Sequence, residues 1–196
     1  AAAIVPYLAR LGISHVYCSP IQRARAGSMH GYDVVAHDQI NPELGGAEGF
    51  ERFTRTLRAQ GLGLLLDMVP NHMGVFGADN GWWMDVLEHG PASVYAQHFD
   101  IDWEPLNPEL RGKVLLPVLG VPYGEALSKG ELVLHFERGE GTARGEAGFA
   151  LRYYEHRFPI APRSHASVLA RAVEAVSDAG PRARLSWPPT RSTSRW

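Results

Sequence analysis

A carboxylate, an amide and an imidazole fall close together in the segment Asp67-Met68-Val69-Pro70-Asn71-His72, and all three form hydrogen bonds readily. The segment closes a predicted strand over 63–69. In a parallel α/β protein the carboxyl ends of the strands open onto the ligand site, so polar groups placed there meet substrate. The structural alternative is an aspartate that caps the following turn, beside a surface histidine.

A second polar cluster, His30-Gly31-Tyr32-Asp33-Val34, lies in a stretch rich in turn-forming residues between Gln22 and Gly46. We expect this stretch to be a long, ordered loop. Five residues in and beyond it are of metal-binding types: His30, Asp33, His37, Asp38 and His72. None of them has the tight spacing of a zinc site, so the sequence predicts no metal and no other cofactor.

Hydrophobic periodicity predicts alternating helices and strands around these clusters. The predicted elements are helices over 4–11 and 47–60 and strands over 13–18 and 63–69. This order predicts an α/β fold in which the two strands lie side by side and parallel, joined by a right-handed crossover through helix 47–60. Strand 63–69 is expected to be buried on both faces, because its apolar run does not alternate.

Beyond the second strand the alternation of helices and strands stops, and the sequence contains many prolines and only short apolar segments. A short amphipathic helix is predicted over 81–90, and apolar runs over 131–136 and 149–154 predict an antiparallel hairpin with a long tip. We interpret residues 73–169 as an inserted, β-rich subdomain. Residues 170–196 are predicted to form an irregular or disordered tail, because they lack a periodic core pattern.

Composition excludes several classes of partner. The formal net charge is -2 and the pI is near 6.5, so the chain lacks the basic surface that binds nucleic acid or an anionic membrane. No apolar run approaches the roughly 20 residues that span a bilayer, and a cytoplasmic location is expected. The single Cys18 lies in an apolar run and is expected to be an inert core residue.

Taken in order, the motifs resemble the maltooligosyltrehalose synthase family of the amylase superfamily, glycoside hydrolase family 13. Asp67-Met68-Val69-Pro70-Asn71-His72 is similar to the first signature region of that superfamily, at the third strand of its (β/α)8 barrel. The other motifs that carry the resemblance are His30-Gly31-Tyr32-Asp33-Val34, Asn41-Pro42-Glu43-Leu44-Gly45-Gly46, Trp82-Trp83, Asp85-Val86-Leu87-Glu88, Asp100-Ile101-Asp102-Trp103, Arg111-Gly112-Lys113-Val114-Leu115-Leu116-Pro117-Val118-Leu119-Gly120 and Tyr153-Tyr154-Glu155-His156-Arg157-Phe158-Pro159. The resemblance runs from the start of the chain to about Leu169.

The resemblance implies a partial (β/α)8 TIM barrel over residues 1–72, with the second and third strands and their helices, because a whole barrel takes about 250 residues. It also implies conversion of the reducing-end α-1,4 linkage of maltooligosaccharides to α,α-1,1, through a covalent glycosyl-enzyme intermediate. That chemistry needs a nucleophile and an acid/base about 5 Å apart. In the superfamily these carboxylates lie on later strands, so we expect an amino-terminal fragment without catalytic residues, inactive alone.

The resemblance assigns substrate binding to three residues. His72 matches a histidine that bonds to the glucose beside the scissile linkage, Tyr32 matches a tyrosine that stacks on that sugar, and His30 lies where a second polar contact is made. Asp67 is expected to anchor the loops at the strand end, and Asn71 to fix the turn that holds His72. Asp33 is expected to support an arginine from a strand outside the chain.

Both Tyr32 and His72 follow a predicted parallel strand, so we expect them to approach one another at the carboxyl end of the strand pair. The expected partners are a maltooligosaccharide and, for the complete enzyme, a trehalose-releasing hydrolase. Two alternatives stay open. The first is a fragment of an α-amylase or α-glucosidase type hydrolase, and the second is a non-catalytic carbohydrate-binding module.

Overall fold

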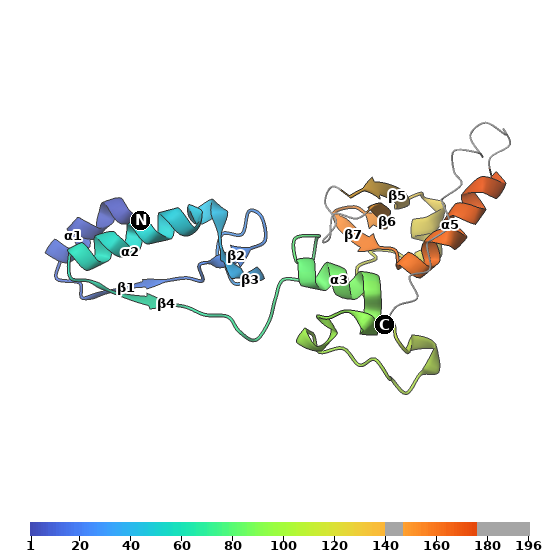
Figure 1. The fold of residues 1–196 in the computed structure, drawn as a ribbon, viewed down its shortest axis with the longest axis horizontal. Helices are drawn as coiled ribbons and strands as arrows, with labels where there is room; N and C mark the ends of the chain where they lie inside the picture. Colours follow the sequence, from blue (N-terminus) through green and yellow to red (C-terminus); the bar gives the residue numbers. More distant parts are fainter. Residues whose placement is uncertain (140–146, 176–196) are drawn as a thin grey trace, which may run out of the picture. The chain divides into compact units, whose positions relative to one another are not determined.

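The computed structural model describes residues 1–139 and 147–175. The chain forms two compact units, Ala1–Gly81 and the part from Trp82 onward, and each is described by itself (Figure 1). Among the described residues, no helix combines the length and apolar character that crossing a bilayer requires.

The first unit is built from short helices around a pair of parallel strands. Its elements are η1 (Ala2–Ile4), α1 (Val5–Arg10), β1 (His15–Cys18), β2 (Gln22–Ala24), β3 (Val34–Ile40), η2 (Pro42–Leu44), α2 (Gly46–Ala59) and β4 (Gly63–Leu66). Strands β1 and β4 pair in parallel, with Val16 opposite Leu64. The predicted parallel pair, connected through the α2 segment, is therefore confirmed.

Helices α1 and α2 cover one face of the β1–β4 pair (Figure 1). The apolar positions of α2 recur at helical spacing and turn Phe53 and Leu57 toward the strands, where they form a core with Val5 and Leu62. The strand side chains packed against this core are Val16, Cys18 and Leu64. Cys18 was expected to be a core residue, and it is half-buried against this core. Burial raises the pKa of its thiol and keeps it protonated.

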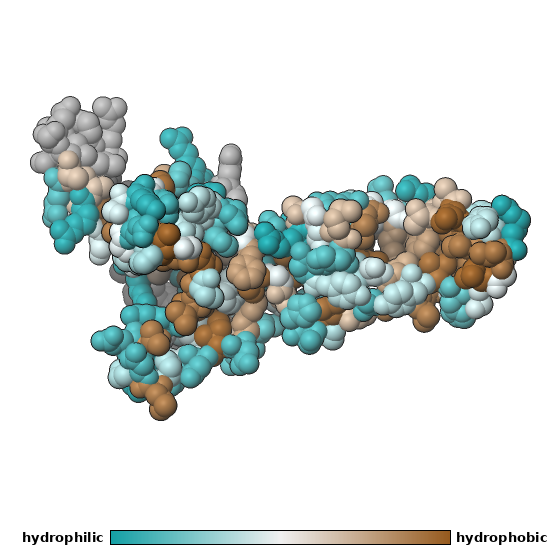
Figure 2. All heavy atoms as spheres, turned by 180° about the vertical axis from the view of Figure 1, so that it is seen from behind, coloured by the Kyte–Doolittle hydropathy of each residue, from teal (hydrophilic) through white to brown (hydrophobic). Residues whose placement is uncertain are grey.

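The opposite face of the β1–β4 pair is exposed, so the expected burial of the second strand on both faces was wrong. Tyr17 is 63% exposed and Leu65 is 54% exposed. The physical reason is that the described residues supply helices to one face only, whereas a parallel strand is buried on both faces when two layers cover it. The strand also ends earlier than predicted, at Leu66. Figure 2 shows apolar side chains at the surface of this unit.

The stretch between Gln22 and Gly46 is not a long loop, which corrects a second prediction. Strands β2 and β3 pair antiparallel, with irregular register beside Arg23. Val34 and Val35 are buried, so they fix β3 against the rest of the unit. The turn-forming residues that suggested a loop are instead concentrated in the connection between the two strands, which carries the cluster from His30 to Asp33.

The second unit contains a three-stranded antiparallel sheet flanked by helices. Its elements are α3 (Gly81–His89), η3 (Gly90–Ala92), η4 (Ala96–His98), η5 (Pro108–Leu110), α4 (Tyr123–Ser128), β5 (Leu132–Arg138), β6 (Ala147–Tyr153), β7 (His156–Pro159) and α5 (Pro162–Ala175). The strand order is β5-β6-β7. The predicted hairpin is confirmed as β5 and β6. Strand β7 was not predicted, and it follows a tight turn in which Tyr154 has a φ of 50°.

The predicted irregular tail from residue 170 is helical as far as Ala175, because α5 includes these residues. The half-buried positions Val168, Leu169, Ala172 and Val173 recur at helical spacing and explain the helix. Residues 176–196, which make up the rest of the predicted tail, and residues 140–146 in the predicted hairpin tip lie outside the described residues.

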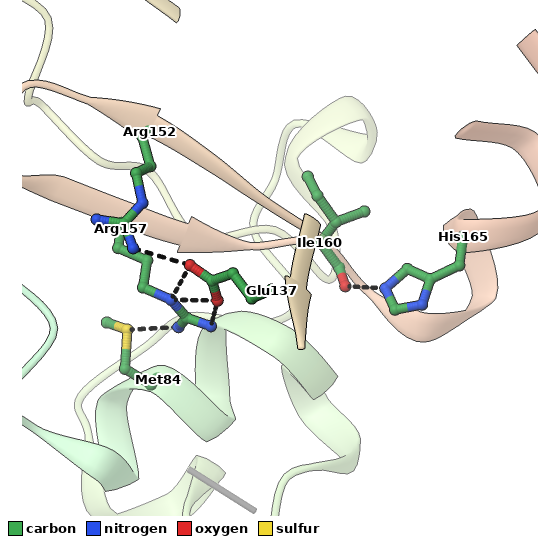
Figure 3. A network of polar contacts seen from close by, with 6 residues as sticks. All are labelled: Met84, Glu137, Arg152, Arg157, Ile160 and His165. Atoms are coloured by element: carbon green, nitrogen blue, oxygen red, sulfur yellow. Dashed lines mark hydrogen bonds and ion pairs between the residues drawn. The ribbon is translucent and has the colours of Figure 1, made fainter. Parts of the chain in front are cut away.

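An ion-pair cluster centred on Glu137 joins the sheet of the second unit to α3 (Figure 3). The Arg157 guanidinium donates from Nη2 and Nε to Glu137 Oε2 at 2.5 and 2.9 Å, and Arg152 Nη2 donates to Oε1 at 2.9 Å. Arg157 also donates to the Met84 sulfur of α3 at 3.6 Å. Arg157 is buried and Glu137 is nearly so, with 6% and 10% of their side chains exposed.

Burial by itself raises the pKa of Glu137, but the hydrogen bonds and charges of Arg157 and Arg152 outweigh it and hold that pKa below its ordinary value. A carboxyl with a lowered folded-state pKa stabilises the fold above its unfolded pKa of about 4.3, and this stabilisation disappears as the pH falls through the folded value.

We predict that Glu137→Gln lowers the free energy of unfolding at neutral pH by about 3 kcal/mol, because Arg157 stays buried without its counter-charge. Urea unfolding followed by tryptophan fluorescence measures the loss. Glu125→Gln is the matched control, since Glu125 pairs with Lys129 on an exposed helix surface and should cost below about 1 kcal/mol. Equal losses in the two variants, or an unchanged acid sensitivity in Glu137→Gln, would contradict this assignment.

Candidate functional site

The carboxylate of Asp67 is the centre of the polar cluster at the carboxyl end of the β1–β4 pair. Asp67 follows β4 directly, and its backbone N–H donates to the Cys18 carbonyl at 3.0 Å. Its Oδ2 accepts hydrogen bonds from two phenols, Tyr17 Oη at 2.6 Å and Tyr32 Oη at 2.5 Å. The expected anchoring of the strand-end loops by Asp67 therefore has a direct geometric basis.

The shared hydrogen bonds shift the titration of all three groups. The hydrogen bond to Asp67 raises the pKa of Tyr17 to about 12 and raises that of Tyr32 in the same direction. In return, the hydrogen bonds from Tyr17 and Tyr32 lower the pKa of Asp67. At neutral pH the phenols therefore stay protonated and the carboxylate stays ionised. An aspartate held in this way is a poor proton acceptor, which fits a structural role better than a catalytic one.

The connection between β2 and β3 presents Tyr32 through a set of local hydrogen bonds. Gly31 has a φ of 79°, and a Cβ there would lie 2.7 Å from the carbonyl oxygen of Pro20, so the chain needs glycine at this position. The Gly31 N–H donates to Ser28 Oγ at 3.2 Å, and the Ser28 hydroxyl donates to Asp33 Oδ1. Asp33 thus shapes its own loop.

The approach of His72 to Tyr32 is confirmed. His72 Nε2 lies 3.0 Å from the Tyr32 carbonyl oxygen, although the residues are 40 positions apart. His72 Nδ1 lies 3.2 Å from Asn71 Oδ1, so Asn71 contacts the imidazole itself, whereas the expected role of Asn71 was to fix the turn that holds His72. A half-turn of the Asn71 amide would place its NH₂ against Nδ1, and Nε2 would then donate to the Tyr32 carbonyl.

His30 and Asp33 lie beside this cluster without joining it. His30 Nδ1 accepts from the Tyr32 N–H at 3.0 Å and lies 3.8 Å from Asp33 Oδ1. His30 also lines a hollow of about 460 Å³ that lies against Phe50 and Phe53 of α2, and neither Tyr32, Asp67 nor His72 lines it. The expected arginine partner of Asp33 has no counterpart in the contacts of the described residues. Those residues also hold no group of three or more His, Cys, Asp or Glu side chains able to bind a metal.

Sequence reasoning missed Tyr17, which belongs to the apolar run Val16-Tyr17-Cys18. Strand alternation would have found it, because successive side chains point to opposite faces. Val16 and Cys18 pack toward the helices, so Tyr17 has to point to the open face, where Asp67 and Tyr32 lie.

The arrangement is suited to binding. Tyr32 is 42% exposed and offers a flat apolar ring whose hydroxyl is already fixed. Such rings pack against the C–H groups of a pyranose. The adjacent exposed imidazole of His72 supplies a polar group for hydroxyls.

Comparison with known proteins finds a matching family model and several similar proteins. The family model "Alpha amylase, catalytic domain" matches residues 3–117. A "Putative maltooligosyl trehalose synthase" from Mycobacterium tuberculosis is 41% identical over 160 residues, covering 77% of this chain and 20% of that protein. A cyclomaltodextrinase from Geobacillus thermopakistaniensis is 38% identical over 105 residues, covering 54% of this chain and 17% of that protein.

Solved structures give the same result. The maltooligosyltrehalose synthase from Arthrobacter ramosus matches with a TM-score of 0.68 and 41% identity, over 87% of this chain and 21% of that one. A hypothetical maltooligosyl trehalose synthase from Sulfolobus tokodaii matches with a TM-score of 0.67 and 32% identity, over 89% of this chain and 22% of that one. The chain therefore spans about a fifth of the length of these synthases.

We predict that Asp67→Asn lowers the pKa of both Tyr17 and Tyr32 toward the ordinary value of about 10, because the anionic acceptor is lost. NMR titration of tyrosine labelled with ¹³C at Cζ resolves the individual phenols. Asp38→Asn, at an exposed position of β3, is the control and should leave both pKa values unchanged. Unshifted phenols in Asp67→Asn would show that the carboxylate does not hold them.

Proposed function

Because this chain belongs to the alpha-amylase catalytic domain family, we propose that it forms a sugar-binding part of an enzyme that acts on maltooligosaccharides. The parallel β1–β4 pair with α2 is part of the (β/α)8 barrel of that family, and the described residues do not close a barrel. By resemblance these strands are the second and third of the barrel.

The reaction we propose is the conversion of the reducing-end α-1,4 linkage of a maltooligosaccharide into the α,α-1,1 linkage of trehalose. The observation that carries the proposal is the match to synthases over both units, since the Arthrobacter ramosus enzyme covers 87% of the chain. The match to the cyclomaltodextrinase covers only 54%. The longer match favours a synthase over a hydrolase.

In the proposed site, the Tyr32 ring stacks on the glucose beside the scissile linkage while Asp67 fixes its hydroxyl. His72 bonds to a hydroxyl of the same sugar. Because its Nε2 contacts the Tyr32 carbonyl, we assign the sugar contact to Nδ1. The sugar hydroxyl would displace the exposed Asn71 amide from Nδ1. His30, whose side chain is 60% exposed, supplies a second polar contact.

We propose that the nucleophile and the acid/base come from parts of the enzyme outside this chain. Retaining glycosyl transfer needs two carboxylates about 5 Å apart. Asp67 is unsuited to either role, since two phenols donate to its Oδ2. The rearrangement also needs water to be excluded, so that the released glucose attacks the glycosyl intermediate in place of water. For the complete enzyme we further propose a cytoplasmic location and a trehalose-releasing hydrolase as its partner in the pathway.

Incubation of the 196-residue chain with maltopentaose should yield no trehalose-terminated product, because we assign the reacting carboxylates to other parts of the enzyme. Chromatography of the products tests this expectation. Product formation by the purified chain would overturn the assignment of the catalytic groups. Tight binding of maltopentaose without turnover would instead favour a self-sufficient carbohydrate-binding module.

A chimera tests the reaction itself. Residues 1–175 of this chain replace the matching fifth of the Arthrobacter ramosus synthase, to which they are 41% identical. The chimera should form a trehalose-terminated product from maltopentaose, whereas a chimera that only hydrolyses maltopentaose would favour the hydrolase alternative.

In this chimera His72→Ala should lower kcat more than it raises KM, because contacts at the reacting sugar strengthen in the transition state. Loss of one preorganised hydrogen-bonding group at the reacting sugar is worth about 2–4 kcal/mol. His135→Ala, at an exposed position of β5, is the matched control and should keep full activity. An unchanged kcat in His72→Ala would mean that His72 does not contact the reacting sugar and only connects the two loops through its contact with the Tyr32 carbonyl.

A further inference from the structure

We propose that Tyr17 is a positioning residue of the sugar-binding site, whose hydroxyl fixes the Asp67 carboxylate and thereby the ring of Tyr32. The inference rests on the proposed function for its effect on sugar binding. The geometric part, that Tyr17 controls Tyr32 through Asp67, stands without it.

Three separate segments meet at a single oxygen atom. Tyr17 comes from β1, Tyr32 from the connection between β2 and β3, and Asp67 from the chain just after β4. Both phenols donate to Asp67 Oδ2, at 2.6 and 2.5 Å. A rotation of the carboxylate that suits one phenol therefore moves the acceptor away from the other, so the two phenols fix one orientation together.

The direction of control follows from how each partner is held. The backbone of Tyr17 is fixed in the parallel ladder opposite Leu65, and the ladder continues to the Asp67 N–H, which donates to Cys18. Tyr32 lies in a connection outside the strands, where local hydrogen bonds and its carbonyl contact with His72 hold the backbone. The side-chain position of Tyr32 thus depends on Asp67. The side-chain position of Asp67 depends in turn on Tyr17, which lies in a strand.

The surroundings of Tyr17 argue against a packing role. Its side chain is 63% exposed on the face opposite the helices, so it contributes little to the core around Phe53 and Leu57. The pKa of Tyr17, raised by its hydrogen bond to Asp67, agrees with a hydroxyl that is committed to the carboxylate. What the phenylalanine variant loses is therefore the hydroxyl, with its hydrogen bond to Asp67 and its contact with the Tyr32 hydroxyl, and little packing.

The first test uses the 196-residue chain labelled with ¹³C at tyrosine Cζ. In Tyr17→Phe, the Tyr32 signal should change its chemical shift and its pKa, because the carboxylate that it contacts is no longer fixed. Tyr7→Phe, at an exposed position of α1, is the control and should leave the Tyr32 signal unchanged. An unchanged Tyr32 signal in Tyr17→Phe overturns the proposal, and this result does not depend on any sugar.

The second test measures kcat/KM for maltopentaose in the chimera with the Arthrobacter ramosus synthase. Tyr17→Phe should lower kcat/KM roughly tenfold, the effect expected for one hydrogen bond to a charged group. In an Asp67→Asn background the same substitution should lower it by less than about twofold, because Tyr17 acts through Asp67. Equal effects in the two backgrounds would contradict the proposal.

The variant Tyr17→Ala separates positioning from direct stacking on the sugar. If Tyr17 acts by positioning, Tyr17→Phe should lower kcat/KM nearly as much as Tyr17→Ala does, because both variants lack the hydroxyl. A Tyr17→Phe chimera with full activity beside an impaired Tyr17→Ala would overturn the proposal in favour of ring stacking. If the parent chimera makes no product, the proposed function fails, and the Tyr32 signal alone then decides whether Tyr17 positions Tyr32.

Discussion

The hydrogen bonds from two phenols to one oxygen of Asp67 are the interaction on which the candidate site depends. They connect a strand, a strand end and an interstrand connection that are distant in the sequence. The parallel ladder of β1 and β4 makes this possible, because it carries Asp67 to the same end of the pair as the segment after Cys18. The contact of His72 with the Tyr32 carbonyl then adds the imidazole to the same group.

The one-sided core explains why these residues are available to a ligand. Helices α1 and α2 bury the face that carries Val16 and Leu64, and the opposite face keeps Tyr17 and Leu65 exposed. In a barrel of the alpha-amylase family the polar ends of the strands face the substrate. The second unit has an internal ion pair of its own, between Glu137 and Arg157.

The sequence predicted the parts of the fold that depend on local pattern. The parallel pair, helix α2 and the β5–β6 hairpin followed from hydrophobic periodicity, and the meeting of Tyr32 with His72 followed from strand-end geometry. The pairing of β2 with β3 was missed, because turn-forming residues in their connection masked two short, irregularly paired strands. Tyr17 was missed because an aromatic residue in an apolar run is a core residue in most proteins, and the exposed face that it occupies depends on which layers cover the sheet.

A crystal structure of the chimera with bound maltopentaose would test the central claim most directly, namely that the carboxyl end of the β1–β4 pair binds sugar through a tyrosine held by Asp67. We predict a glucose ring stacked on Tyr32, with the Tyr17 and Tyr32 hydroxyls still on Asp67 and the His72 imidazole in hydrogen-bonding contact with the same glucose. Maltopentaose bound elsewhere, with Tyr32 free of sugar and its hydroxyl away from Asp67, would contradict the account.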